Sequence, residues 1–282
     1  MHDKILDLLR RGETDAALQQ ARVAASATPE DAAAQRQLAI VLQQAGDYAS
    51  ARAAIGRAIE LAPDDPEAHF DLAALLFSER EHDAAQAALG RSIALDPNQF
   101  EAYLIQAQLA LGRGDLDEAE RQRKLAARVD DAHPQLAAID GMLALRRGDG
   151  QLAQQILATA VQRAPDEPQL LYALGFAYMQ LGHLAFAEQA FRKVVERVPA
   201  ATNLHALIAD LLRQQGRPAD AVEAMAPLLA DPAKATPGLA RLAGELELEA
   251  NRPEAALAHL RQALAARPDD PQVLRAALEA WL

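Results

Sequence analysis

Apolar and polar residues alternate along this chain in blocks that fit helices joined by short turns. In YALGFAYMQLGHLAFAEQAF, which begins at Tyr172, the residues Tyr172, Phe176 and Met179 are spaced four and three apart. This spacing places them on one face of a predicted helix. The acidic segments PDDPE, PDEPQ and PDDPQ read as helix starts, because acidic side chains are stabilised near helix N-termini. We therefore expect an all-α chain.

The composition agrees with this expectation. Hydrophobic residues make up 51% of the chain and aromatic residues only 4%, so most of the apolar share is Ala, Leu and Val, and Ala and Leu favour helices. The stretch quoted above nevertheless holds five of the few aromatic residues (6 Phe, 4 Tyr and 1 Trp). These rings either form a core or provide a surface for a ligand.

Three residue types recur with a period of 34 residues, which indicates an internal repeat. The prolines on this period are Pro29, Pro63, Pro97, Pro165 and Pro199. The glycines are Gly12, Gly46, Gly114, Gly148, Gly182 and Gly216. The alanines are Ala17, Ala51, Ala85, Ala119, Ala153, Ala187 and Ala221.

Each residue type has a mechanical role in a unit of two helices. We expect the glycine to end the first helix, where the backbone can need a positive φ. We expect the alanine to lie where the two helices approach closely. The proline follows the second helix, which it cannot continue. The period therefore predicts helix, short turn, helix, short turn.

This pattern resembles the tetratricopeptide repeat (TPR) family, in the form of a bacterial protein of about eight repeats. The unit from Pro168 matches the family signature of large, small, Ala and Pro positions with Leu171, Leu174, Gly175, Tyr178, Ala187, Phe191, Val194 and Pro199. The resemblance implies a right-handed α-solenoid of antiparallel helix pairs, in which the first helix of each pair lines the concave surface. The expected units are 1–31, 32–65, 66–99, 100–133, 134–167, 168–201, 202–235 and 236–270.

The last segment, 271–282, reads as another first helix. It is either a capping helix that tucks Trp281 inward or the first helix of a truncated ninth unit. The repeat pattern favours truncation, with a longer native chain cut after Leu282.

The resemblance also implies a binding surface, because positions 2, 5, 9, 12 and 13 of each first helix face the groove. Position 9 is often polar in the family, yet here Met142 and Phe176 occupy it in adjacent units, which predicts an apolar strip for an amphipathic helix or peptide. Self-association is the alternative use. The expected groove residues are Phe70, Phe77, Leu104, Gln108, Leu111, Met142, Leu145, Tyr172, Phe176, Met179, Asp210 and Arg213.

Two known TPR subclasses do not fit. The middle units place Glu, Phe, Leu, Ala and Met where a carboxylate clamp uses Lys, Asn and Arg, and only three Asn residues occur, too few for an asparagine ladder. Arg241 and Glu245 are expected to point inward with Asp210 and Arg213, so the groove should change from apolar to charged toward the C-terminus. Tyr178 and Phe191 occupy core positions, and Phe186 has no clear place.

One joint breaks the repeat pattern. Gln106, Arg123 and Asp140 occupy positions that are normally apolar and packed. Because a lone buried charge is costly, we expect Arg123 to pair with Asp140, with Gln106 nearby. The alternative is that Arg123 swings to solvent, and the joint could act as a hinge.

Charge and chemistry narrow the function. The net charge of −12 disfavours nucleic acid as a partner. The chain has no Cys, no paired His at helical spacing and no GxxxxGK[ST], GxGxxG or GxSxG motif, so we expect no enzyme, no cofactor and no metal. No run approaches 18 apolar residues and the N-terminus does not resemble a secretory signal, so we expect no membrane insertion and a cytoplasmic location.

We therefore expect a scaffold or adaptor that binds a protein or peptide in an apolar groove. The alternative is the N-terminal, substrate-recruiting arm of a larger enzyme of the sulfotransferase, glycosyltransferase or 2-oxoglutarate oxygenase type. A homodimer that closes its own apolar strip is a third possibility.

Overall fold

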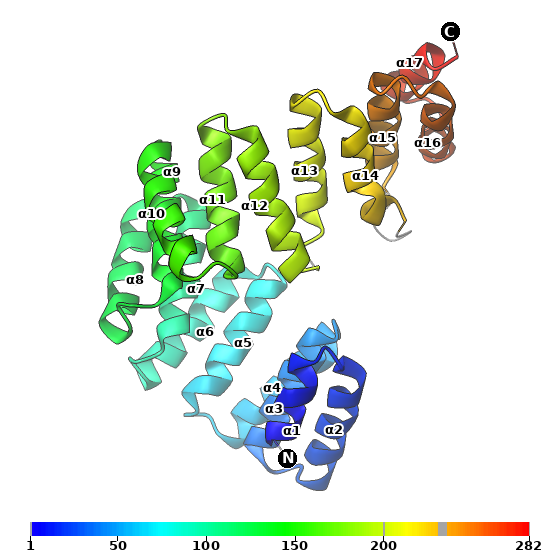
Figure 1. The fold of residues 1–282 in the computed structure, drawn as a ribbon. Coiled ribbons are helices and arrows are strands. Elements are labelled where there is room, and N and C mark those ends of the chain that lie inside the picture. The colour runs from blue at the N-terminus through cyan, green and yellow to red at the C-terminus, as the bar shows by residue number, and fades with distance from the viewer. Residues whose placement is uncertain (1, 200, 231–235, 282) are drawn as a thin grey trace. The chain divides into compact units, whose positions relative to one another are not determined.

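The computed structural model describes residues 2–199, 201–230 and 236–281, and in these residues the chain forms 17 α-helices and no strand. The helices fall into two compact units, Met1–Ile139 and Asp140–Leu282. Figure 1 shows the order of the helices within each unit.

The first unit contains eight complete helices and the start of a ninth. They are α1 (His2–Arg10), α2 (Thr14–Ala27), α3 (Ala32–Gln44), α4 (Tyr48–Leu61), α5 (Pro66–Ser78), α6 (His82–Leu95), α7 (Phe100–Arg113), α8 (Leu116–Val129) and α9 (Pro134–Arg146). The boundary between the units falls inside α9.

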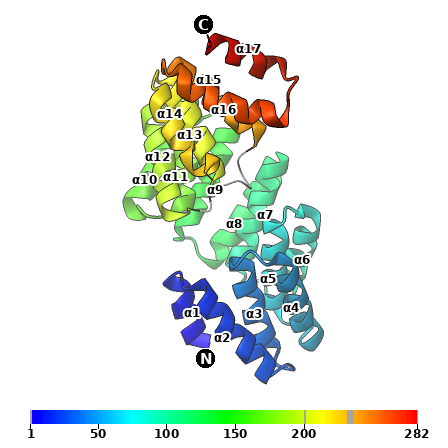
Figure 2. The same cartoon turned by 90° about the vertical axis from the view of Figure 1, so that its right-hand side faces the viewer.

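The second unit continues from α9 through eight further helices. They are α10 (Gly150–Arg163), α11 (Pro168–Gln180), α12 (Leu184–Arg197), α13 (Asn203–Gln214), α14 (Pro218–Leu229), α15 (Pro237–Glu249), α16 (Pro253–Ala266) and α17 (Pro271–Glu279). Figure 2 gives a second view of both sets of helices.

Consecutive helices pack in pairs. In the first unit α3 packs with α4, α5 with α6 and α7 with α8, and in the second α11 packs with α12, α13 with α14 and α15 with α16. This is the helix–turn–helix arrangement that the 34-residue period predicts, and the all-α fold is confirmed. The handedness of the array stays a prediction.

The glycine positions behave as expected. All six glycines on the 34-residue period have a positive φ, between 72° and 84°. After α11, for example, the N–H of His183 donates to the carbonyl of Tyr178 (2.8 Å) around Gly182, which satisfies a helix-end carbonyl. Two residues at the equivalent turns are not glycine, namely Arg80 (φ 63°) and Asn251 (φ 58°).

The alanine and proline roles are also confirmed. The seven alanines of the period are at most 1% exposed. The second helices α2, α4, α6, α10 and α12 each end two residues before the proline of their repeat. At Gly175 of α11, a side chain of the partner helix lies directly against the glycine. A Cβ added at Gly175 would lie 2.6 Å from the Phe191 ring.

Each unit has its own apolar core. In the second, Phe191, Leu211, Leu212 and Met225 are fully buried in one cluster. In the first, Ile55 and Leu75 belong to one cluster and Leu89 to another. These cores hold the first helices of the repeats in place.

Trp281 is 79% exposed, so it is not tucked inward. Whether the segment 271–282 is a capping helix or the first helix of a ninth unit stays a prediction. Leu282 lies outside the described residues. Arg123 belongs to the first unit and Asp140 to the second, so their expected pairing stays a prediction.

Candidate functional site

An apolar pocket lies on the second unit between α9 and α11. Its volume is about 560 Å³. All five apolar groove residues expected in this part of the chain contribute to it, together with one cation and one amide. The lining residues are Met142, Leu145, Arg146, Tyr172, Phe176, Met179 and Gln180.

The aromatic side of this pocket rests on the core. The Phe176 ring meets the fully buried Phe191 ring edge-on, with centroids 5.2 Å apart, and Tyr172 meets Phe176 at 4.9 Å in the same manner. Such edge-to-face contacts hold aromatic rings in fixed orientations. Burial raises the pKa of the Tyr172 phenol, which therefore stays neutral and a hydrogen-bond donor at physiological pH.

The aromatic cluster of the sequence thus divides by helix face. Phe191 is core, as expected, and Phe176 and Tyr172 extend from it into the pocket. Tyr178 is half-buried and packs against the same core cluster as Phe191, and its ring centroid lies 5.3 Å from that of Phe186. Phe186, which sequence alone does not place, is 57% exposed.

A single cation stands at the edge of the apolar pocket. Arg146 is exposed and takes part in no ion pair or side-chain hydrogen bond among the described residues. The two methionines beside it, Met142 and Met179, are half-buried and can adjust their shape to a ligand. The pocket can therefore take an apolar side chain next to an acidic one.

The first unit presents its expected groove residues differently. Phe70, Phe77 and Gln108 are half-buried. Leu104 and Leu111, however, are only 3% and 4% exposed. These two leucines are packing residues, so the expectation that they line an exposed groove is corrected.

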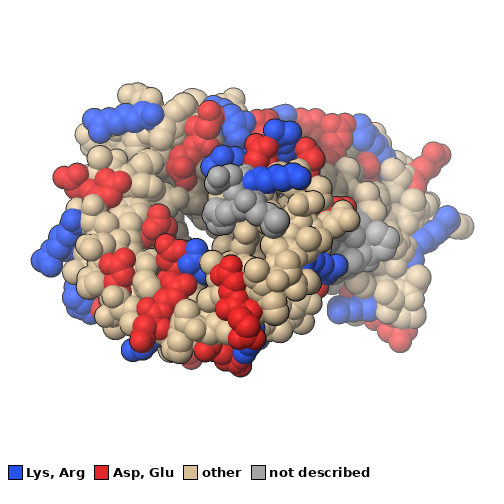
Figure 3. All heavy atoms as spheres, turned by 90° about the horizontal axis from the view of Figure 1, so that it is seen from below, with Lys and Arg blue, Asp and Glu red and all other residues tan. Residues whose placement is uncertain are grey.

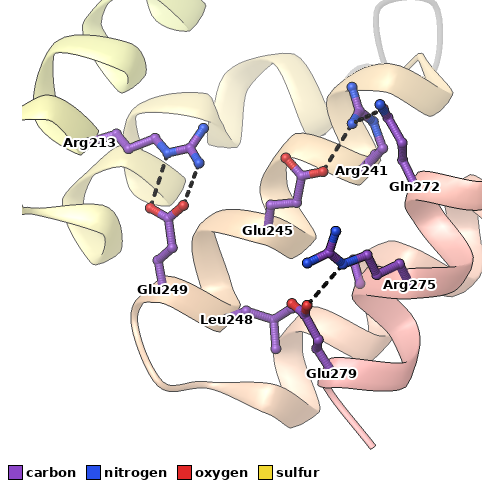
Figure 4. A pocket seen from close by; sticks show the side chains of 9 residues that line it. Arg213, Arg241, Glu245, Leu248, Glu249, Gln272, Arg275 and Glu279 are labelled. Atoms are coloured by element: carbon purple, nitrogen blue, oxygen red, sulfur yellow. Dashed lines mark hydrogen bonds and ion pairs between the residues drawn. The ribbon is translucent and has the colours of Figure 1, made fainter.

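A second pocket in the second unit is polar (Figure 4). It has a volume of about 370 Å³ and includes three of the charged residues expected to point inward, Arg213, Arg241 and Glu245. Asp210, the fourth, is exposed and accepts a hydrogen bond from Gln214 (2.8 Å) instead. The pocket is completed by Leu248, Glu249, Gln272, Arg275, Ala276 and Glu279.

The charges in the polar pocket are internally paired. Arg213 Nε donates to Glu249 Oε2 (3.1 Å), and a second guanidinium nitrogen contacts the other carboxylate oxygen. Arg241 Nη1 donates to Glu245 (3.0 Å), as the dashed lines in Figure 4 show. A ligand would have to compete with these pairs, so the polar pocket is the weaker candidate.

An ionic cluster in the first unit was not foreseen. Arg36 on α3 faces three carboxylates, Asp65, Glu67 and Asp71, and lies 3.2 Å from Asp71 Oδ2 through Nε. The Asp71 side chain is only 18% exposed, and this oxygen makes no well-aligned hydrogen bond. Burial raises the pKa of Asp71 to about 7. The positive charge of Arg36 opposes this rise, and the negative charges of Glu67 and Asp65 add to it.

The sequence did contain a signal for this cluster. Arg36 and Asp71 occupy neighbouring positions of the first helices in successive repeats, so a search for opposite charges about one period apart would find them. Among the described residues, this cluster included, no three His, Asp or Glu side chains are arranged to bind a metal ion. None of its helices has the length and apolarity needed to cross a membrane.

Comparison with known families identifies the repeat. Tetratricopeptide repeat models match residues 2–66, 36–85, 70–137, 144–211 and 206–271. The chain therefore belongs to the tetratricopeptide repeat family. This fold serves in general as a scaffold for protein–protein interaction, and proteins of this kind are generally not enzymes. No curated protein sequence matches the chain significantly.

Solved structures agree on the fold. A chain of the APC/C hetero-tetramer Cut9–Hcn1 is 16% identical, with a TM-score of 0.68 over 95% of this chain and 53% of that one, so this chain spans about half the length of that relative. A TPR protein from Parabacteroides merdae is 15% identical (TM-score 0.55; 99% and 97% covered). TTC0263 from Thermus thermophilus is 24% identical (TM-score 0.56; 64% and 98% covered). At these identities the likeness shows the fold alone.

Proposed function

We propose that this protein is an interaction scaffold that binds an amphipathic helix or peptide in the pocket between α9 and α11. The observation that carries the proposal is the pocket itself, in which five apolar side chains from two helices meet beside the free Arg146. The expected ligand presents apolar anchors three or four residues apart, followed by an acidic side chain that reaches Arg146.

Several features favour a peptide over other ligands. The pocket is open and lined by flexible methionines, which suits side chains of varied shape. Figure 3 shows both signs of charge mixed on one face, and the net charge of the chain is −12. A net negative charge repels phosphate backbones, which favours a protein segment over a nucleic acid as the ligand.

The test is a selection from displayed random peptides of roughly 15 residues, about four helical turns. Wild-type protein and a Met142→Glu, Met179→Glu variant would be used in parallel. These substitutions place acids in the pocket but keep the contact between Phe176 and Phe191, and circular dichroism would verify the fold. We expect wild type to enrich acidic amphipathic peptides that the variant does not bind.

A control variant, Glu249→Ala, alters the polar pocket and should bind the selected peptides as wild type does. Peptides that bind wild type and the methionine variant equally would contradict the proposal. Binding that is lost in Glu249→Ala instead would assign recognition to the polar pocket.

Arg146 supplies a sharper prediction. Arg146→Glu should lower the affinity for the selected acidic peptides severalfold. Peptides with a lysine in place of the acid should regain affinity for this variant. Fluorescence anisotropy with labelled peptides at two salt concentrations checks both effects, because screening should reduce the difference at high salt. Equal affinity of both peptides for both proteins would show that Arg146 does not contribute to binding.

An enzyme arm that recruits substrates would use the same pocket, so that alternative concerns what the scaffold serves and not how it binds. The same peptide selection applies to it. Sequencing the open reading frame past Leu282 distinguishes the two, because a recruiting arm requires that the frame continue into a catalytic domain.

A further inference from the structure

The second helices α10 and α12 each expose a large apolar side chain at the same position of the repeat. Leu152 on α10 is 45% exposed and Phe186 on α12 is 57% exposed, and the two are 34 residues apart. The equivalent residues of the repeats before and after them are Glu118 and Asp220. Acidic residues are the usual kind at a surface position, so the two apolar side chains are a local departure within the interior of the array.

Phe186 is held in place by two neighbouring rings. Its centroid lies 5.3 Å from that of Tyr178 and 6.3 Å from that of His183. The next residue, Ala187, is fully buried and anchors this turn of α12 in the core. The phenylalanine is therefore presented to solvent from a fixed position, and it lies apart from the pocket between α9 and α11, which it does not line.

The surface around Leu152 and Phe186 carries amides instead of charges. Gln155 and Gln189 are exposed, and each lies three residues after one of the apolar side chains, on the same side of its helix. We call these four residues the neutral patch. In α10 the one charged residue is Arg163 in the last turn, and in the first two turns of α12 it is Glu188, which is only 6% exposed.

We propose that the neutral patch pairs with the same patch of a second copy of this chain across a two-fold axis. A symmetric interface has to be self-complementary. Apolar side chains match apolar ones, and glutamine amides both donate and accept hydrogen bonds, so the neutral patch meets this condition. Each copy has a net charge of −12, so two copies approach most easily where neither presents an exposed acid.

The charges at the two margins of the neutral patch favour an antiparallel arrangement. Asp149 caps the start of α10, where its carboxylate accepts a hydrogen bond from the N–H of Leu152 (2.9 Å). Lys193 lies about two helical turns after Phe186 on α12, is exposed, and takes part in no ion pair among the described residues.

Short turns join α10 to α11 and α11 to α12, so α10 and α12 run in the same direction. When α10 of one copy lies antiparallel to α12 of the other, the start of α10 is beside the later turns of α12. Asp149 of each copy then comes within reach of the long Lys193 side chain of the other. The symmetric pair gains two attractive contacts of this kind.

The measurement is sedimentation velocity of the full chain over a range of concentrations. With two large apolar side chains per copy, we expect an interface below the roughly 1,200 Å² of stable complexes and a dimer that forms only at higher concentration. The variant Leu152→Glu, Phe186→Glu should stay monomeric. Val23→Glu, at a side chain that is 55% exposed on α2, is the matched control and should dimerise as wild type does.

Circular dichroism would verify that these variants keep the fold. A wild-type chain that is monomeric at every concentration would overturn the proposal. So would a dimer that persists in the double glutamate variant, or one that Val23→Glu weakens equally.

A mixing experiment tests whether the neutral patch meets its own copy. Leu152→Lys, Phe186→Lys should be monomeric alone, as should the double glutamate variant, because each places like charges across the axis. Mixed at low salt, the two should form a mixed dimer that dissociates as salt is raised. Absence of a mixed dimer would mean that the patches do not face each other.

Lys193→Glu tests the orientation. It should weaken the dimer severalfold, since it sets two acids beside Asp149 of the other copy. In an Asp149→Asn background, where asparagine still caps the helix, the same substitution should cost much less. An equal effect in both backgrounds would rule out the antiparallel arrangement. None of these residues lines the pocket between α9 and α11, so the peptide selection should be unchanged in all the variants and the two proposals can fail separately.

Discussion

Arg80 occupies a backbone position that glycine holds in six other repeats. Its φ of 63° is left-handed, and this conformation costs a residue with a Cβ about 1 kcal/mol or more. The exposed side chain makes no ion pair among the described residues to offset the cost. We predict that Arg80→Gly raises the unfolding free energy by about 0.5–1 kcal/mol, since glycine's extra freedom in the unfolded chain returns part of the gain.

Urea denaturation followed by circular dichroism checks this prediction. Gly148→Ala is the reciprocal control, because it places a Cβ at φ 84° and should lower the urea midpoint. Asn251→Gly should change stability less than Arg80→Gly, because asparagine tolerates the left-handed region. An unchanged or lowered midpoint for Arg80→Gly would refute the backbone argument.

Asp71 gives a prediction about pH. Its folded pKa of about 7 lies above the ordinary value of 3.8, so between these pH values the folded protein holds a proton that the unfolded chain has released. Stability from this group is therefore greatest below about pH 4, falls as pH rises and reaches its minimum above about pH 7.

Asp71→Asn should remove this dependence. We expect the variant to equal or fall below wild type at pH 4 and to exceed it at pH 8, by a few kcal/mol at most. Urea midpoints of both proteins across this pH range measure the difference in stability. The contributions of other titrating groups are nearly the same in both proteins and largely cancel in this difference. A difference that is constant with pH would mean that Asp71 stays ionised in the fold.

At the scale of the helix, α11 and α12 pack closely where Gly175 of α11 meets the Phe191 ring of α12. Gly175 lets the Phe191 ring lie against the α11 backbone, and an added methyl would come within 2.6 Å of it. We predict that Gly175→Ala destabilises the protein by about 1–3 kcal/mol, because the fully buried ring has little room to move.

Gly90→Ala on α6 is the matched control. An added Cβ there meets nothing within 4 Å, so only helix propensity acts and stability should rise by up to about 1 kcal/mol. Thermal or urea unfolding of both variants distinguishes the effects. Equal changes of one sign would show that propensity, and not the contact with Phe191, decides the outcome at position 175.

At the scale of the whole chain, the sequence was informative wherever one residue type has one mechanical role. The 34-residue period placed the turns, the buried alanines and the helix ends, because glycine, alanine and proline act through their own backbone or size. The resemblance to the repeat family, and not the period itself, pointed to the five apolar residues that line one pocket.

The exposure and contacts of other side chains depend on neighbouring residues that sequence spacing does not identify. Leu104 and Leu111 have the positions of groove residues, but the structure buries both. Arg36 and Asp71 form a cluster only because successive first helices lie side by side, and the position of Phe186 depends on its contact with Tyr178. In each case the side chain's surroundings, and not its own type, decide whether it is exposed.

The pattern of helix contacts gives the last prediction. Within each unit, the substantial contacts recorded for the described residues join helices that are at most two apart in chain order, so we expect the stability of the array to be a sum of local terms. Ile55 on α4 and Met225 on α14 are both buried, at 1% and 0% exposed, and each alanine substitution should cost about 2–5 kcal/mol. We expect Ile55→Ala to speed amide hydrogen exchange in α3–α5 and leave α12–α14 unchanged, and Met225→Ala to do the reverse. Exchange that accelerates in both regions for either variant would instead mean that the chain opens as one cooperative unit.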